Sequence, residues 1–310
     1  MRDLSISRTT FSWGVPVNSD KEHIMYVWMD ALTNYLTAIG YPDTDSDSYK
    51  KYWGADLHMV GKDIVRFHTV YWPAFLMAAD LPLPKKVFAH GWWTNEGEKI
   101  SKSLGNVIDP VDLVNEFGVD QVRYFMMREV PFGNDGDFSK TAIIGRMNFD
   151  LANNIGNFCQ RSLSMIAKNC DGVLPNATLI DEDIKLINSA SAVLSEVRTH
   201  IDNQKYNKAL ESIWRVVGEA NKYVDAQAPW GLKKTDFARM ETVLYTCAET
   251  TRRLGILLLP FIPESAEKIL ALVGVDSKSV DFESLENSLV NGVKLPSPQG
   301  IFPRYVESAE

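Results

Sequence analysis

The stretch LHMVGKDIVRFHTVYWPAFLMAADLPLPKKVFAHGWW, residues 57–93, decides the fold class. Residues 57–60 are a short run typical of a buried strand, and residues 64–79 carry apolar side chains at helical spacing. Residues 86–93 form another strand-like run. Strands separated by a helix of this length indicate parallel β–α units, so we predict an α/β fold here. Such sheets bind ligands at the carboxyl ends of their strands.

The flanking segments extend this pattern in both directions. Upstream, residues 1–20 are expected to be an extended connection, residues 23–28 a strand of the same parallel kind and residues 31–39 a helix, with a loop at residues 43–48. Downstream of residue 107 we predict no strand. Asp109 and Pro110 are typical of a helix start, Gly118 of its end, and Asp120 of a cap for the next helix.

From Ser139 onward the sequence predicts a bundle of four or five long helices. One apolar stripe recurs every three to four residues, as expected for one helix face; its members are Ile143, Met147, Leu151, Ile155 and Phe158. Similar stripes run through residues 184–201, 209–223 and 240–259, whereas residues 285–303 resemble a loop. The predicted fold class is therefore α/β plus all-α.

Composition excludes several classes of protein. With 310 residues, 45% hydrophobic and 23% charged, the chain is neither disordered nor fibrous and has the length of two domains. It contains no run of 18 apolar residues and no signal-peptide pattern, so we expect no membrane association. Its three cysteines form no C-x-x-C pair, which predicts no zinc or other metal site and a reducing, cytoplasmic location.

The net charge is −8, but residues 140–240 hold 13 Lys and Arg against 11 Asp and Glu, so RNA contact is expected to be local.

The most specific local signal is Lys99-Ile100-Ser101-Lys102-Ser103. It follows a predicted strand and a turn, and it combines hydroxyl and ammonium groups that suit a triphosphate. The stretch resembles the KMSKS signature of class I aminoacyl-tRNA synthetases, with isoleucine in the methionine position. By this resemblance the catalytic residues are Lys99, Ser101, Lys102 and Ser103. The lysines would stabilise the pyrophosphate that leaves ATP.

Two further stretches narrow the resemblance to the methionyl-tRNA synthetases. They are YVWMDALTNY at residues 26–35 and GKDIVRFH at residues 61–68. The resemblance implies a methionine pocket made by Trp28, Ala31, Tyr35, Ile64 and His68. A polarisable sulfur packs well against aromatic rings, which fits this set. The resemblance also assigns ATP binding to four residues besides Lys102, namely Gly61, Asp63, His90 and Gly91.

The predicted helical bundle also contains residues that resemble the family. Asn157 and Arg161 are four residues apart, so they share a helix face, and residues 226–230, which include Trp230, are expected to end another helix. In the family these positions read the anticodon CAU, with a splayed base stacked on the tryptophan. The resemblance implies three domains: a return from the connective insertion at 1–20, the second half of a Rossmann-like catalytic domain at 21–138, and an anticodon-binding bundle at 139–310.

The resemblance implies a methionine–tRNA ligase that uses ATP with Mg²⁺, methionine and tRNA(Met). The family's His-x-Gly-His signature does not occur in this sequence. We therefore expect a C-terminal portion of the enzyme, catalytically incomplete alone, monomeric, and able to pair with a separate N-terminal half. Two alternatives remain open at this point. One is a class I synthetase for Leu, Ile or Val, and the other is a non-catalytic tRNA-binding protein.

Overall fold

The computed structural model describes residues 4–306, so Arg2 and Asp3 of the expected return segment lie outside the described residues. The chain divides into two compact units. The first comprises Met1–Trp92 together with Gly133–Asp135, and the second comprises Trp93–Phe132 together with Gly136–Glu310.

The first unit begins with a small antiparallel sheet, which corrects two predictions. β3 (Asp20–Met25) pairs antiparallel with both β1 (Ser7–Arg8) and β2 (Pro16–Val17), in the order β1–β3–β2. The prediction of a parallel strand at residues 23–28 was wrong, and the first 20 residues are not a plain connection. Val17 is paired with Asp20, so a tight hairpin joins β2 to β3. Antiparallel strands can be joined in this way, whereas parallel strands need a crossover connection such as a helix.

The rest of this unit contains the predicted parallel β–α unit. The helices α1 (Val27–Thr37) and α2 (Asp47–Tyr52) precede β4 (His58–Gly61). Helical segments then run from Lys62 through the π-helical η2 (Phe67–Tyr71) into α3 (Trp72–Ala78), and β5 (Val87–His90) pairs parallel with β4. Both strands are thus confirmed. The core of the unit consists of Leu32, Leu36, Tyr49, Trp72 and Leu76.

The second unit opens with another small sheet, in the order β7–β6–β8. β6 (Trp93–Asn95) pairs antiparallel with β7 (Glu98–Lys99) and parallel with β8 (Gly136–Phe138). The prediction of no strand after residue 107 was therefore wrong. β8 has three residues, too few for an alternating pattern to be recognised in the sequence.

Two short helices connect β7 to β8. Asp109 caps α4 (Pro110–Phe117) as predicted, because its Oδ1 accepts the Val111 amide at 2.7 Å. Gly118 ends α4, and α5 (Val119–Arg128) follows directly. The capping role predicted for Asp120 was wrong: its carboxylate is buried and accepts the Ser265 amide at the start of α12 (Pro263–Leu272).

A nearly continuous helix, residues 140–169, leads into the bundle. It consists of α6 (Lys140–Arg146), the π-helical segment η4 (Met147–Gly156) and α7 (Asn157–Asn169). All five residues of the predicted stripe are buried. The remaining bundle helices are α8 (Asp181–Asp202), α9 (Tyr206–Gln227), α10 (Pro229–Thr235), α11 (Phe237–Leu258) and α12.

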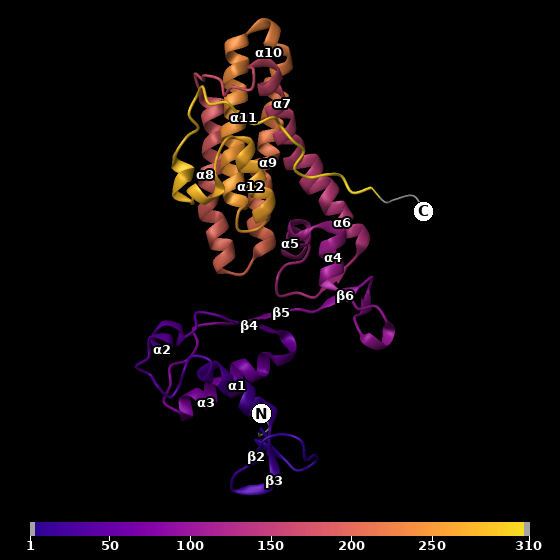
Figure 1. Cartoon of the computed structure of the whole chain (residues 1–310), viewed down its shortest axis with the longest axis vertical. Coiled ribbons are helices and arrows are strands. Elements are labelled where there is room, and N and C mark those ends of the chain that lie inside the picture. The colour runs from indigo at the N-terminus through magenta and orange to yellow at the C-terminus, as the bar shows by residue number, and fades with distance from the viewer. Residues whose placement is uncertain (1–3, 307–310) are drawn as a thin grey trace. The chain divides into compact units, whose positions relative to one another are not determined.

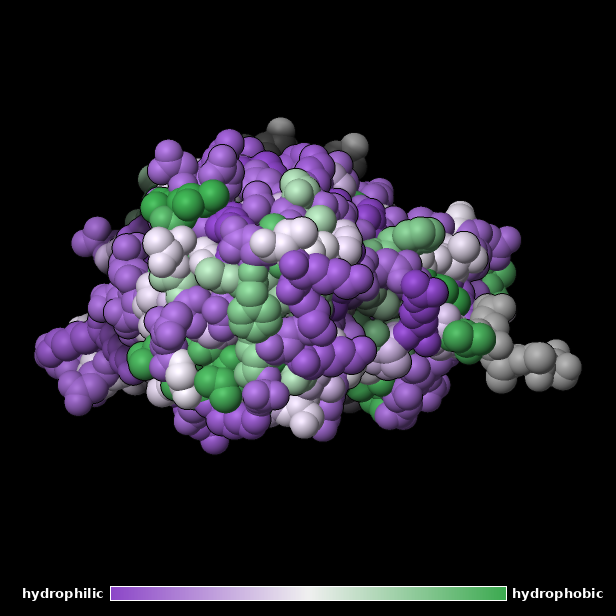
Figure 2. All heavy atoms as spheres, turned by 90° about the horizontal axis from the view of Figure 1, so that it is seen from above, coloured by the Kyte–Doolittle hydropathy of each residue, from purple (hydrophilic) through white to green (hydrophobic). Residues whose placement is uncertain are grey.

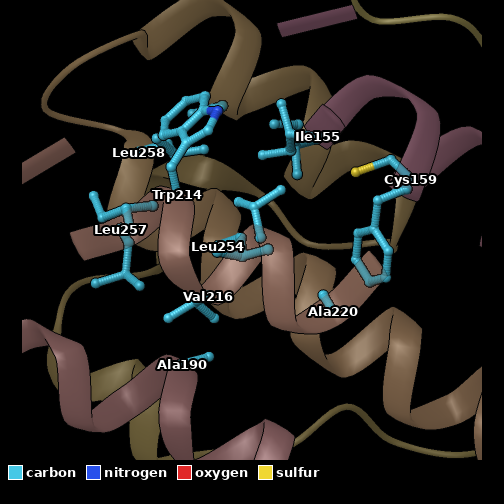
Figure 3. Close-up of a cluster of buried hydrophobic side chains, with 14 of the residues drawn as sticks. Ile155, Cys159, Ala190, Trp214, Val216, Ala220, Leu254, Leu257 and Leu258 are labelled. Atoms are coloured by element: carbon cyan, nitrogen blue, oxygen red, sulfur yellow. The ribbon is translucent and has the colours of Figure 1, made fainter. Parts of the chain in front are cut away.

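The bundle core lies between α7, α8, α9, α11 and α12, which pack side by side (Figure 1). Ile155, Cys159, Trp214 and Leu254 point into this core (Figure 3). Figure 2 shows a face on which hydrophilic residues predominate and hydrophobic residues form separate small patches. Within residues 4–306, every helix is too short or too polar to span a bilayer.

Candidate catalytic and RNA-binding sites

A cluster of rings from α1 and η2 gathers three of the predicted methionine residues. Trp28 and Tyr35 lie on α1, and the buried His68 lies on η2. The His68 Nδ1 is 3.0 Å from the Ile64 carbonyl oxygen, which can only accept, so this nitrogen carries the proton. Nε2 is then left to accept from the Tyr35 hydroxyl at 2.9 Å. These two bonds fix the ring between the two helical segments.

Further rings complete the cluster. Phe67 stacks on Trp28 with ring centroids 3.9 Å apart and planes 10° from parallel, while His68 meets Trp28 edge-on at 6.3 Å. His58 on β4 lies 4.5 Å from the Tyr35 ring. Burial, followed by the nearby His68, lowers the pKa of His58, and burial raises the pKa of Tyr35. The cluster therefore presents aromatic surface, which suits an apolar side chain.

The other predicted residues of this group take different positions. Ala31 lies on α1 between Trp28 and Tyr35, on the same helix face, and is exposed. Ile64 is half-buried and contributes the carbonyl oxygen that His68 binds. The small side chain of Ala31 leaves room beside the Trp28 and Tyr35 rings.

The predicted ATP residues lie at the carboxyl ends of β4 and β5. Gly61 is in register with His90 across the parallel pair, and Asp63 and Gly91 follow the two strands. A Cβ on Gly91 would overlap the Asn134 carbonyl group, so the backbone there tolerates only glycine. A Cβ on Gly61 would meet the Asp63 carboxylate at 2.5 Å. Parallel sheets bind ligands at this edge.

The sequence reasoning missed an ion pair at the same edge. Lys62 Nζ lies 2.6 Å from both carboxylate oxygens of Asp135 and 4.3 Å from the centroid of the Trp92 ring. Asp135 also accepts the Trp92 amide at 2.9 Å. The hydrogen bond from Lys62, with that amide, lowers the pKa of Asp135. Because Lys62 and Asp135 are 73 positions apart, no local pattern could have paired them.

The lysine–serine loop, residues 99–103, is closed by its own hydroxyl groups and by Asn106. Ser101 Oγ accepts the Leu104 amide at 3.2 Å and lies 2.9 Å from Ser103 Oγ. The Asn106 side chain accepts the Ser101 amide at 2.9 Å and donates to the Lys99 carbonyl at 3.1 Å. Two backbone groups of the loop thus depend on one carboxamide, a role that the sequence did not reveal.

The two lysines of the loop point into solvent. Lys99 and Lys102 are exposed, and within the described residues neither forms an ion pair. Exposed ammonium groups on a short, internally bonded loop are free to meet a phosphate chain.

In the bundle, Arg161 on α7 faces Trp230 on α10. The guanidinium carbon lies 5.8 Å from the Trp230 ring centroid, and Nη1 pairs with Asp225 at 2.9 Å. Nε and Nη2 of Arg161 are buried and have no partner among the described residues. Trp230 is 52% exposed, so its ring can stack with a ligand.

The third predicted RNA-binding residue, Asn157, borders a cavity of about 420 Å³. Asn153, Gln160 and Arg304 also line it, and the Gln160 Oε1 is a buried acceptor with no partner among residues 4–306. Several polar side chains therefore lie beside Asn157 in this cavity.

Comparisons with known proteins identify the family. Residues 1–163 match the family model described as tRNA synthetases class I (M), and residues 174–309 match the anticodon-binding domain of methionyl tRNA ligase. The first match covers more than half of the chain. The chain belongs to the class I tRNA synthetases of the methionine type. This decides against the alternative of a Leu, Ile or Val enzyme.

Individual relatives agree with this assignment. The chain is 57% identical to methionine–tRNA ligase of Brucella suis over its whole length and 60% of that protein, and 54% identical to that of Mycobacterium leprae over 99% of the chain and 58% of that protein. A structure of Mycobacterium tuberculosis methionyl-tRNA synthetase in complex with methionyl-adenylate matches with a TM-score of 0.92 and 54% identity, covering 98% of this chain and 61% of that one. The synthetase chain thus spans about three fifths of these relatives.

The structure of this synthetase chain brings the predicted residues together in groups. Trp28, Tyr35 and His68 meet in one ring cluster, and Arg161 meets Trp230. The expectation that residues 226–230 end one helix was wrong for Trp230: α9 ends at Gln227, Ala228 is left-handed, and Trp230 belongs to α10, which begins at Pro229. This sharp turn between the two helices places the indole opposite α7.

Proposed function

We propose that this chain carries part of the catalytic domain and the tRNA-reading bundle of a methionine–tRNA ligase. The reaction joins methionine to ATP, releases pyrophosphate and passes the methionyl group from the adenylate to tRNA(Met). ATP enters with Mg²⁺ as substrate. In this proposal residues 1–20 return from a connective insertion, residues 21–138 belong to the catalytic domain, and residues 139–310 bind the anticodon.

The ring cluster in the first unit is the proposed methionine pocket. Trp28 and Tyr35 would hold the thioether between aromatic surfaces, where sulfur packs favourably. Ala31 and Ile64 would border the pocket, and His68 would fix Tyr35 through its hydrogen bond. The Mycobacterium tuberculosis relative is described as a complex with methionyl-adenylate, which supports this ligand.

Two groups of residues are proposed to contact ATP, one at the carboxyl ends of β4 and β5 in the first unit and one on the lysine–serine loop in the second. Gly61, Asp63, His90 and Gly91 would contact the nucleoside. When the methionine carboxylate attacks the α-phosphate, charge builds on the departing pyrophosphate. Lys99 and Lys102 would stabilise this charge, and the hydroxyl groups of Ser101 and Ser103 keep the loop folded.

The arrangement of Arg161 and Trp230 carries the proposal for tRNA. A half-exposed indole beside a guanidinium with two unpartnered nitrogens suits a splayed nucleobase, which would stack on the ring and accept hydrogen bonds at its edge. Asn157, one turn away on α7, would add an amide to the same edge. Cytosine, the first base of CAU, offers O2 and N3 as acceptors.

Equilibrium binding to a CAU anticodon stem-loop tests this function in the 310-residue chain. We expect a preference of about 1–3 kcal/mol over the same stem-loop with its first anticodon base changed, because a polar site left unpaired is costly. Trp230→Ala should weaken CAU binding by a similar amount, since stacking contributes about 1–3 kcal/mol per base.

Trp92→Ala is the matched control, because Trp92 is also 52% exposed and belongs to the first unit. It should leave RNA affinity unchanged. Equal affinity of the chain for both stem-loops would contradict the proposed anticodon recognition.

We further propose that the chain alone does not catalyse methionine-dependent ATP–pyrophosphate exchange. It contains no His-x-Gly-His sequence, the other signature that the family uses at the ATP site. The proposed state is a cytoplasmic monomer that can associate with a separate N-terminal half. Exchange at a normal enzymatic rate by residues 1–310 would refute the first statement.

A further inference from the structure

A tight turn precedes the lysine–serine loop. Thr94 is paired with Lys99 and Asn95 with Glu98, so Glu96 and Gly97 form a two-residue hairpin turn. Both turn residues have positive φ, 50° and 81°, as a type I′ turn requires. Glutamate adopts this conformation reluctantly, so the turn needs support from outside the hairpin.

Asp137 on β8 provides that support. Its Oδ1 accepts the Gly97 amide at 2.8 Å and the Thr94 hydroxyl at 2.5 Å. These hydrogen bonds, led by the one from Thr94, lower the pKa of Asp137. β8 also pairs with β6 through the backbone, which places Asp137 directly opposite Thr94. The carboxylate therefore bonds to the first strand of the hairpin and to its turn.

The turn is also attached to the helix that enters the bundle. The Glu96 amide donates to the Phe138 carbonyl at 2.9 Å, and the Glu96 carboxylate accepts the Lys140 amide at 3.1 Å. Lys140 is the first residue of α6, and Ser139 at its cap makes no side-chain capping bond. The hairpin thus supplies an acceptor for the helix start, where free amides favour a carboxylate.

On its other side the hairpin holds the lysine–serine loop. The Asn95 side chain donates to the Asn106 carbonyl at 3.0 Å, and Asn106 binds the backbone of Lys99 and Ser101. A series of hydrogen bonds therefore runs from Asp137 through the hairpin to the loop, entirely within the second unit.

We propose that Asp137 is a positioning residue for the lysine–serine loop, which it acts on by fixing the Glu96–Gly97 turn. This role rests on the proposed function of Lys99 and Lys102 in binding the phosphates of ATP. Without the Asp137 acceptor, the Glu96–Gly97 turn loses its support, and the loop that carries the two lysines is held less firmly. Asp137 itself touches neither substrate nor the reacting atoms.

Amide hydrogen exchange by NMR on the whole 310-residue chain tests the positioning directly. Asp137→Ala should accelerate exchange at Gly97 and Ser101 by about 3- to 10-fold, as expected for the loss of one hydrogen bond. Asp137→Asn should restore wild-type exchange, because its amide oxygen accepts in the same place. Thr94→Val removes one partner without changing Asp137, and it should accelerate exchange in the same direction.

Titration with tripolyphosphate then tests the phosphate-binding role. Asp137→Ala should weaken binding by about 3- to 10-fold, and Asp137→Asn should rescue it. The control is Asp281→Ala, which removes an exposed carboxylate that accepts bonds from Ser284 in the same unit. It should match the wild type in both measurements.

The results distinguish the positioning role of Asp137 from the phosphate-binding role of Lys99 and Lys102. Wild-type exchange in Asp137→Ala and Thr94→Val, or no rescue by Asp137→Asn, would overturn the positioning role. Failure of the wild-type chain to bind tripolyphosphate would contradict the proposed role of the lysines, while the exchange rates would still decide whether Asp137 positions the loop.

Discussion

Replacing Asp183 by Asn should strongly destabilise the bundle. Asp183 lies in the first turn of α8, is fully buried, and accepts the Tyr223 hydroxyl at 2.5 Å and the Ile180 amide at 2.9 Å. Arg239 on α11 adds two bonds, at 2.6 and 2.8 Å. An asparagine can accept only part of this set, and its NH₂ group opposes the remaining donors.

The magnitude follows from the burial of both charges. The Arg239 side chain is 16% exposed, so Asp183→Asn leaves a largely buried guanidinium without its counter-ion. Breaking such a pair costs about 3–5 kcal/mol. That is about a fifth or more of the unfolding free energy of an ordinary domain, about 5–15 kcal/mol.

Urea unfolding followed by far-ultraviolet circular dichroism measures the loss. Asp281→Asn, a change at an exposed carboxylate, should alter the unfolding free energy by less than about 0.5 kcal/mol. A loss below about 1 kcal/mol for Asp183→Asn at pH 7 would refute the claim that this cluster joins α8, α9 and α11.

The same pair predicts a pH dependence with a definite sign. Burial acts to raise the pKa of Asp183, but the hydrogen bonds from Arg239, Ile180 and Tyr223 outweigh it and hold the pKa below its ordinary value. The stabilisation is therefore complete above the unfolded pKa of about 3.9 and is lost as the pH falls through the lower folded value. The difference between wild type and Asp183→Asn should shrink below about pH 4, and a constant difference from pH 7 to pH 3 would contradict this.

Three further changes test the remaining sites. Tyr35→Phe leaves the buried His68 Nε2 without its donor, so the first unit should lose about 1–3 kcal/mol of stability in thermal or urea unfolding, and methionine affinity should fall in calorimetry. Gly91→Ala places a methyl group against the Asn134 carbonyl and should cost about 1–3 kcal/mol in urea unfolding; an unchanged midpoint would contradict the close approach. Asn106→Ala removes two bonds to the lysine–serine loop and should raise amide exchange at Ser101 without changing the helical circular dichroism.

Much of the helical half was predictable because its core repeats at helical spacing. Each stripe residue from Ile143 to Phe158 is buried, and the apolar periodicity of a helix is visible within one segment. The candidate site residues came from the resemblance to the family, and spacing adds only which of them share a helix face. Trp28 and Tyr35 lie on one helix, so their shared face follows from their spacing alone.

The partners of short strands were not predictable in the same way. β3 was recognised as a strand, but alternation does not say whether its neighbours run parallel or antiparallel. β8 is even shorter, and its role depends on Asp137 meeting Thr94 from 43 positions away. Long-range pairs of this kind leave no periodic trace in the sequence.

Buried charged residues are a second feature that the apolar periodicity of a helix does not reveal. Glu249 on α11 is fully buried and binds both Arg252 and Arg253, which are buried as well. The sequence pattern would place these three charged positions in solvent. They can be buried because the segment after α12 supplies the missing partners: the Ser284 carbonyl accepts from Arg252, and the Leu289 amide donates to Glu249.

This explains why a segment that resembles a loop is nevertheless part of the bundle. Residues 285–303 contain little regular structure, yet their start is fixed by the buried charges of α11, and Leu295 and Phe302 are buried. Phe302 and Arg304 then line the cavity that Asn157 borders. The surface proposed to read RNA is therefore assembled from a helix that periodicity predicts and from a segment whose position depends on ion pairs. Only the helix could have been recognised from the sequence.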